Sequence, residues 1–149
     1  MRSVLALVLL LVSSACFPLI PVGPFSTDLH FHPVDGGAPL PGRINVHFGW
    51  QSATVVVTLP DGGAFQGEFD VKAPAPDREM APAWDRVFGQ GYFDAKVLGS
   101  PQHVRVALKG PEGREMKAEF HSLRRPEGGV SISEGVAVDA QGRVFKMGQ

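Results

Sequence analysis

Apolar and polar residues alternate along several short stretches of the chain. In residues 43–48 every second side chain is apolar, which is typical of a strand that buries one face. Three pairs of alternating or β-branched stretches are each joined by a short run that contains Gly with Pro or Asp, so each pair predicts a β-hairpin. The expected hairpins cover residues 53–71, 103–121 and 136–147.

The segments between these hairpins carry weaker patterns. Residues 33–42 and 124–129 are rich in Gly and Pro and predict loops. Residues 72–83 contain three prolines and mixed charge, and predict a long surface loop with room for a short helical turn. Residues 92–98 predict a further strand, after a bulge or tight bend at Gly89-Gln90-Gly91.

These patterns predict an all-β fold, either an antiparallel β-sandwich or a small β-barrel built from hairpins, with about seven to nine short strands. The 18 Gly and 13 Pro disfavour long helices. Residues 29–149 are expected to form this single β domain. The formal net charge of −1 gives no electrostatic reason to expect nucleic acid as a partner.

Two of the expected hairpins are similar in sequence. Residues 55–59 match residues 104–108, and residues 63–69 match residues 114–120, both ending in Glu-Phe. Residues 142–145 form a weaker third copy. Either a true duplication or the shared alternation of any two hairpins explains the match, and both explanations imply antiparallel β structure.

The N-terminus has the pattern of a secretory signal peptide. Arg2 precedes an uninterrupted apolar run over residues 4–12, and small residues follow at 13–15. The run is much shorter than the roughly 20 residues that a spanning helix needs. Residues 1–15 are therefore expected to be removed on export.

Cys16 is the only cysteine, so a disulfide within the chain is excluded. Residues 12–16 (Val-Ser-Ser-Ala-Cys) resemble the lipobox of bacterial lipoproteins, although Ser13 stands where leucine is usual. The resemblance implies a lipid-modified Cys16 at the mature N-terminus, and Phe17 in place of an aspartate implies the outer membrane. Ordinary cleavage after Ala15, which would give a soluble secreted protein, is the alternative. Residues 16–28 are then a lipidated N-terminus with a Pro-rich tether.

The second half of the chain contains a series of short motifs. They are Trp-Asp-Arg-Val-Phe-Gly from Trp84, Gly-Tyr-Phe-Asp-Ala from Gly91, Val-Leu-Gly from Val97, Gly113, Glu119-Phe120, Gly-Val-Ala-Val-Asp from Gly135 and Gly-Arg-Val-Phe-Lys from Gly142. With these motifs, about residues 84–147 resemble a group of small bacterial envelope lipoproteins. The resemblance implies a β fold and an envelope location, and implies no activity.

His30-Phe31-His32 is the sharpest candidate for chemistry. On an extended strand both imidazoles point to one face, where they could ligate Zn²⁺ or Cu²⁺ with His47 or Asp35. The alternative, which the pattern favours, has Phe31 facing the core and both histidines facing water.

Two carboxylates and a set of aromatic residues are weaker candidates. Asp85 and Asp94 flank the Gly89–Gly91 bend and could do acid–base work in a hydrolase. The sequence favours turn capping by one and solvation of the other, because nothing places the two carboxylates within reach of each other. No nucleophile-elbow, P-loop, dinucleotide or zinc-protease motif occurs. The aromatic residues are more typical of a core than of a ligand groove; they are Phe65, Phe69, Trp84, Phe88, Tyr92, Phe93, Phe120 and Phe145.

The expected function is that of a non-enzymatic envelope lipoprotein, structural or interacting with another envelope protein, with no cofactor. Its expected membrane partner is reached through the lipid on Cys16. A metal-binding module built on His30 and His32 is the alternative.

Overall fold

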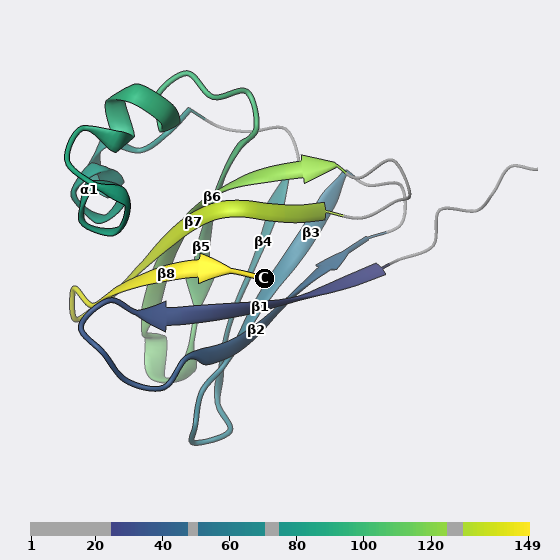
Figure 1. Ribbon diagram of the computed structural model, residues 1–149. Helices are drawn as coiled ribbons and strands as arrows, with labels where there is room; N and C mark the ends of the chain where they lie inside the picture. The colour runs from purple at the N-terminus through teal and green to yellow at the C-terminus, as the bar shows by residue number, and fades with distance from the viewer. Residues whose placement is uncertain (1–24, 48–50, 71–74, 125–129) are drawn as a thin grey trace, which may run out of the picture.

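The computed structural model describes residues 25–47, 51–70, 75–124 and 130–149. Within these residues eight antiparallel strands follow one another around a closed barrel, and β1 pairs with β8 to close it (Figure 1). This confirms the all-β prediction and selects its barrel form. The strands are β1 (Phe25–Pro33), β2 (Leu40–Val46), β3 (Ser52–Thr58), β4 (Ala64–Asp70), β5 (His103–Lys109), β6 (Glu115–Arg124), β7 (Val130–Asp139) and β8 (Val144–Gly148).

The three predicted hairpins are present as β3–β4, β5–β6 and β7–β8. The expected N-terminal boundary is wrong, because β1 already begins at Phe25. Residues 25–28, which the sequence placed in the tether, therefore pair with β2 as part of the barrel wall. The predicted signal peptide, Cys16 and the rest of the tether lie outside the described residues.

Side chains fill the barrel interior. Alternate residues of each strand point inward, as Val55 and Val57 do on β3. Gly42 lies under the ring of Phe31, and a Cβ there would come within 2.7 Å of that ring. The Phe31 ring of β1 therefore packs over the neighbouring strand β2, where a glycine leaves room for it. The largest buried interior residues are Leu29, Phe31, Ile44, Leu108, Met116, Phe120, Phe145 and Met147.

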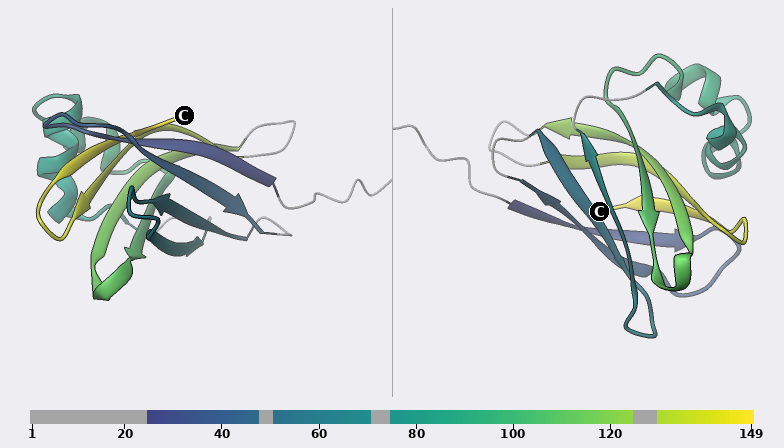
Figure 2. Two further views of the ribbon diagram at one scale, coloured as in Figure 1. Left: turned by 90° about the horizontal axis from the view of Figure 1, so that it is seen from below. Right: turned by 180° about the vertical axis from the view of Figure 1, so that it is seen from behind.

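A helical segment joins β4 to β5 and lies outside the barrel (Figure 2). We call residues 75–102 the cover segment. It contains a 3-10 turn (Arg78–Met80), helix α1 (Ala81–Phe88) and a π-helical turn (Phe93–Val97). Helix α1 packs on β7 and β8.

The strand predicted at residues 92–98 is therefore wrong. Gly89 and Gly91 have φ angles of 112° and 79°, so the chain turns sharply after α1 instead of extending. The Asp85 carboxylate accepts hydrogen bonds from the backbone N–H groups of Gly91 and Phe93, at 3.0 and 2.9 Å, and fixes this turn. The short helical turn expected near residues 72–83 is present, and it continues into α1.

The cover segment has its own apolar core against the outer face of the barrel. Trp84 and Phe93 from the segment are buried against Val136 of β7 and Val144 of β8. This cluster is separate from the barrel interior, so outward-facing positions of β7 and β8 are apolar as well as the inward ones. The remaining buried members are Met80, Ala83 and Val97.

Candidate functional site

A polar cluster lies beneath the cover segment, on the outer face of β5 and β6. The side chains of His103 and Glu119 are fully buried, and His121 is 8% exposed. The three positions face outward because their neighbours Val104, Ala118 and Phe120 face the barrel interior. An outward position on a strand normally meets water, so the cover segment is what buries this cluster.

Glu119 fastens the cover segment to the barrel. Its Oε1 accepts the backbone N–H of Asp77 at 2.9 Å, and its Oε2 accepts the indole N–H of Trp84 at 3.0 Å. Both oxygens of one buried carboxylate therefore bind the same segment, at two points seven residues apart. Hydrogen bonds to an ionised acceptor are stronger than those between neutral groups.

His103 and His121 complete the cluster. They lie directly opposite each other on β5 and β6, with ring centroids 6.1 Å apart. The Nε2 atom of His103 is 3.5 Å from Glu119 Oε1, near enough for attraction but without a hydrogen bond. Within the described part of the chain, both ring nitrogens of His103 and the Nε2 of His121 are buried without a hydrogen-bond partner. Unsatisfied buried polar atoms of this kind are unusual in a folded protein.

The ring of His121 is stacked under the indole of Trp84, with centroids 5.3 Å apart. Burial lowers the pKa of His121, and the nearby His103 lowers it further. Glu134 on β7, whose Oε2 lies 3.6 Å from His121 Nδ1, opposes this shift, but burial is the larger effect. The neutral imidazole is therefore the form that the folded protein favours.

The same Glu134 oxygen accepts the hydroxyl of Tyr92, which extends the cluster toward the surface. Burial, together with the hydrogen bond and the negative charge of Glu134, raises the pKa of Tyr92 to about 12. The Tyr92 ring stacks on Phe88 at 4.8 Å. Tyr92 thus stays protonated and acts as a hydrogen-bond donor that ties the cover segment to β7.

The candidate metal ligands are placed apart from this cluster. His30 and His32 are exposed on the outer face of β1, with ring centroids 6.0 Å apart, while Phe31 points inward. The His47 ring bonds the hydroxyls of Ser52 and Thr54. The Asp35 carboxylate pairs with Arg86. Among the described residues no three His, Cys, Asp or Glu side chains form a group that could hold a metal ion.

The two candidate acid–base residues have separate partners. The backbone N–H groups of Phe93 and Gly91 lower the pKa of Asp85, which serves as the acceptor within the turn described above. Asp94 is exposed and lies 3.5 Å from Arg78. The structure therefore gives these carboxylates the turn-capping and solvated roles that the sequence favoured.

The aromatic candidates lie mainly in the two cores. Phe65, Phe69, Phe120 and Phe145 are in the barrel interior, and Trp84 and Phe93 are under the cover segment. Phe88 and Tyr92 are half-buried beside Trp84.

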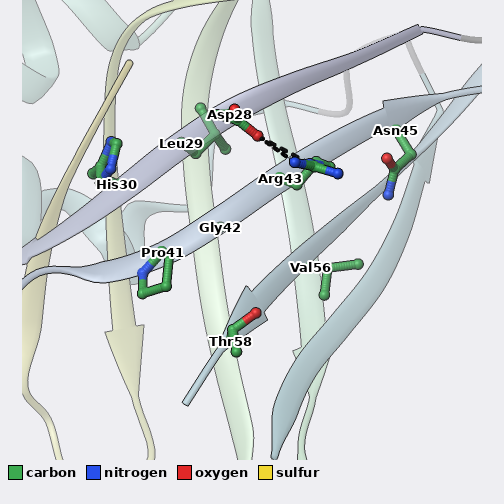
Figure 3. Close-up of a pocket in the computed structure, with 9 residues that line it drawn as sticks. All are labelled: Asp28, Leu29, His30, Pro41, Gly42, Arg43, Asn45, Val56 and Thr58. Carbon is green, nitrogen blue, oxygen red and sulfur yellow. Dashed lines mark hydrogen bonds and ion pairs between the residues drawn. The ribbon is translucent and has the colours of Figure 1, made fainter. Parts of the chain in front are cut away.

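The outer face of β1, β2 and β3 carries a shallow open groove of about 570 Å³ (Figure 3). Asp28 and Arg43 form an ion pair of 2.9 Å across it. Asn45 and Thr58 also line it, so its polar side chains present both donors and acceptors to solvent.

Sequence reasoning missed the buried cluster. His103, Glu119 and His121 stand at polar positions of alternating strands, and the pattern places such residues in water. The sequence contains one signal of this burial. Outward positions of β7, including Val136, are apolar like the inward ones, which indicates that another element packs on the outside of the sheet.

No protein-family model matches the chain, and searches of curated proteins and of solved structures found no match. Among the described residues, no helix has both the length and the apolar character needed to cross a membrane. The resemblance to envelope lipoproteins stays a prediction.

Proposed function

We propose that this protein is an exported, lipid-anchored protein of the bacterial cell envelope and that its barrel serves as a non-enzymatic structural or interaction module. The observation that carries the proposal is the position of Cys16. The chain's only cysteine directly follows an apolar run and three small residues. A lone cysteine in an exported protein needs a role, and lipid attachment supplies one.

Mass spectrometry of the mature N-terminus tests the anchor directly. The expected mass is that of a chain beginning at Cys16 with a diacylglyceryl group on its sulfur. A chain that begins at Cys16 with a free thiol, or that retains Met1, would refute lipid anchoring.

The packed interior supports binding on the outer surface. Because side chains occupy the barrel centre, a partner would contact outward-facing residues, and the β1–β3 groove offers a polar surface for this. The Arg43–Asp28 pair is exposed, with 58% and 71% of the two side chains accessible, so each group can exchange its present partner for another protein at little cost.

Site-specific photo-crosslinking in intact cells tests this surface. A crosslinker at Asn45 in the groove should give one discrete adduct. A crosslinker at Gln66, an exposed position on β4, is the control and should not give that adduct. Equal labelling at both positions, or none at either, would argue against a specific partner in the groove.

The adjacent rings of His30 and His32 support a second candidate, a metal-binding module. Both imidazoles are exposed and face the same side of β1, so two nitrogen ligands are presented together. Calorimetric titration with Cu²⁺ and Zn²⁺ should then show binding. A His30→Ala, His32→Ala double variant should lose this binding, and a His47→Ala variant, which keeps both ligands, should retain it. Absence of binding by the unmodified protein would remove this candidate.

A further inference from the structure

Among the described residues, the buried cluster holds three ring nitrogens without a hydrogen-bond partner, beside the carboxylate that fastens the cover segment. We propose that His103, Glu119 and His121 form an acid-sensitive latch: at neutral pH they hold the cover segment on the barrel, and protonation of the histidines releases that segment while the barrel stays folded. This inference is independent of the lipid anchor.

The fold permits such a release. The cover segment leaves the barrel after β4 and returns at β5, and these two strands pair with each other at Gln66 and Lys109. The barrel is therefore closed without the segment. The apolar cluster under the segment is also separate from the barrel interior, so undocking the segment leaves the main core intact.

One side chain, Glu119, holds two separate parts of the cover segment. Its two hydrogen bonds reach the start of the cover segment, at the Asp77 backbone, and helix α1, at Trp84. His121 lies directly under the Trp84 indole. Any rearrangement that hydrates His121 must therefore move the same indole that Glu119 holds.

Protonation would disturb this arrangement. A charged His121 would be held under an indole and out of full contact with water, and ion burial is unfavourable unless a partner offsets it. The nearest oxygen for it, on Glu134, would have to be shared with the Tyr92 hydroxyl, which it also accepts. A second positive charge on His103, whose ring centroid is 6.1 Å away, would add repulsion.

The sign of the pH effect follows from the folded and unfolded pKa values. The pKa of His121 is lowered from 6.5 by burial under the cover segment, so below that pH the protein binds more protons with the segment undocked than with it docked. The docked state is favoured above pH 6.5 and loses stability as the pH falls below it. Attraction to Glu134 and Glu119 opposes the shift without reversing it.

Other charged groups surround the cluster from each element that packs against it. These groups are Arg105 on β5, Lys117 on β6 and Glu134 on β7, and Asp77, Glu79 and Tyr92 on the cover segment. Arg105 pairs with Asp77 and Lys117 with Glu79, while Glu134 accepts the Tyr92 hydroxyl. Carboxylates ordinarily titrate about two pH units below histidine, so a transition near pH 6 identifies the histidines.

The full chain with Trp50→Phe makes Trp84 the only tryptophan and thus a reporter of the latch. We expect its fluorescence to change between about pH 6.5 and pH 5, with amides of residues 78–97 losing hydrogen-exchange protection while those of β3 and β4 keep it. Release should also expose Val136 and Val144 and so increase binding of an apolar dye.

His121→Phe keeps an aromatic ring under Trp84 but cannot take up a proton, so its transition should move at least about one pH unit lower. His32→Phe, at an exposed histidine, is the matched control and should leave the transition in place. If His121→Phe does not fold, His121→Gln replaces it in the same comparison. The proposal is overturned if the segment and the barrel lose protection together, if no transition occurs, or if the His121 variant keeps the original midpoint.

Discussion

Glu119 illustrates how one buried carboxylate can decide the position of many residues. It is fully buried, and its two oxygens accept donors from two different parts of the cover segment. Neither donor has water as a substitute partner once the segment is docked. Leaving a buried donor unpaired costs more free energy than a typical hydrogen bond contributes on balance. Removing Glu119 should therefore lower stability by more than the net contribution of two ordinary hydrogen bonds.

Replacing Glu119 with Ala should weaken docking of the cover segment by about 2–5 kcal/mol, because it leaves the Asp77 N–H and the Trp84 indole N–H without their acceptor. The free energy of opening from hydrogen exchange of residues 78–97 measures this. Glu115→Ala, at an exposed position of the same strand, is the control and should change it by less than about 0.5 kcal/mol. Equal effects of the two variants would contradict the role of Glu119.

Tyr92 allows a direct spectroscopic measurement, because it is the only tyrosine in the chain. Its ultraviolet absorbance should titrate with a pKa of about 12, above the ordinary 10.0. Because folding raises this pKa, the contribution to stability is present below pH 10.0 and is lost as the pH rises through about 12.

The Glu134→Gln variant should lower the pKa of Tyr92 toward 10.0 without reaching it, because burial remains after the charge is removed. Glu112→Gln, at an exposed turn residue, should have no effect on the titration. An ordinary tyrosine pKa in the unmodified folded protein would show that the hydroxyl is not held by Glu134.

At the scale of elements, the period-two pattern predicted the hairpins correctly because inward and outward positions differ in polarity along each strand. Val55 and Val57 on β3 and Val104 and Val106 on β5 are inward in the structure, as alternation requires. The start of the β domain was predicted at residue 29, four residues after β1 begins, because the prolines before it indicated a tether.

The cover segment could not be predicted from the same pattern. Trp84 and Phe88 are four residues apart, which is a helical spacing, but the chain turns after only eight helical residues. The glycines at 89 and 91 were consistent with a bulge in a strand, but the hydrogen bonds that Gly91 and Phe93 donate to the Asp85 carboxylate fix a turn instead. Because the cover segment buries His103 and Glu119, their site could not be predicted without first predicting that segment.

The junction of β4 and β5 depends on Gly67. A Cβ there would lie 2.2 Å from the backbone oxygen of Ala107, and backbone cannot move aside without shifting the strand. Gly67→Ala should therefore destabilise the barrel by about 1–3 kcal/mol, measured by urea unfolding. Gly148→Ala, which has open space around the added carbon, is the control and should stay within about 0.5 kcal/mol of the unmodified protein. Tolerance of both substitutions would show that β4 and β5 are farther apart.

At the scale of the whole molecule, the protein has two apolar cores on opposite sides of one sheet. The barrel interior contains the larger cluster, and the cover segment shields a smaller one on the outside of β7 and β8. This arrangement separates the stability of the barrel from the docking of the segment. It also leaves the outer face of β1, β2 and β3 accessible, where the groove of Figure 3 lies.

Membrane retention of this protein should depend on Cys16. A Cys16→Ser variant has no sulfur for a thioether lipid, and each buried methylene of an acyl chain contributes about 0.8 kcal/mol to membrane binding. It should therefore leave the membrane fraction, whereas Ser14→Ala, which keeps a small residue before the cysteine, should remain there. The first barrel strand begins at Phe25, so the released variant should unfold at the same urea concentration as a detergent-extracted parent. A Cys16→Ser protein that still pellets with membranes after an alkaline wash would mean that something other than a lipid on this cysteine holds the barrel.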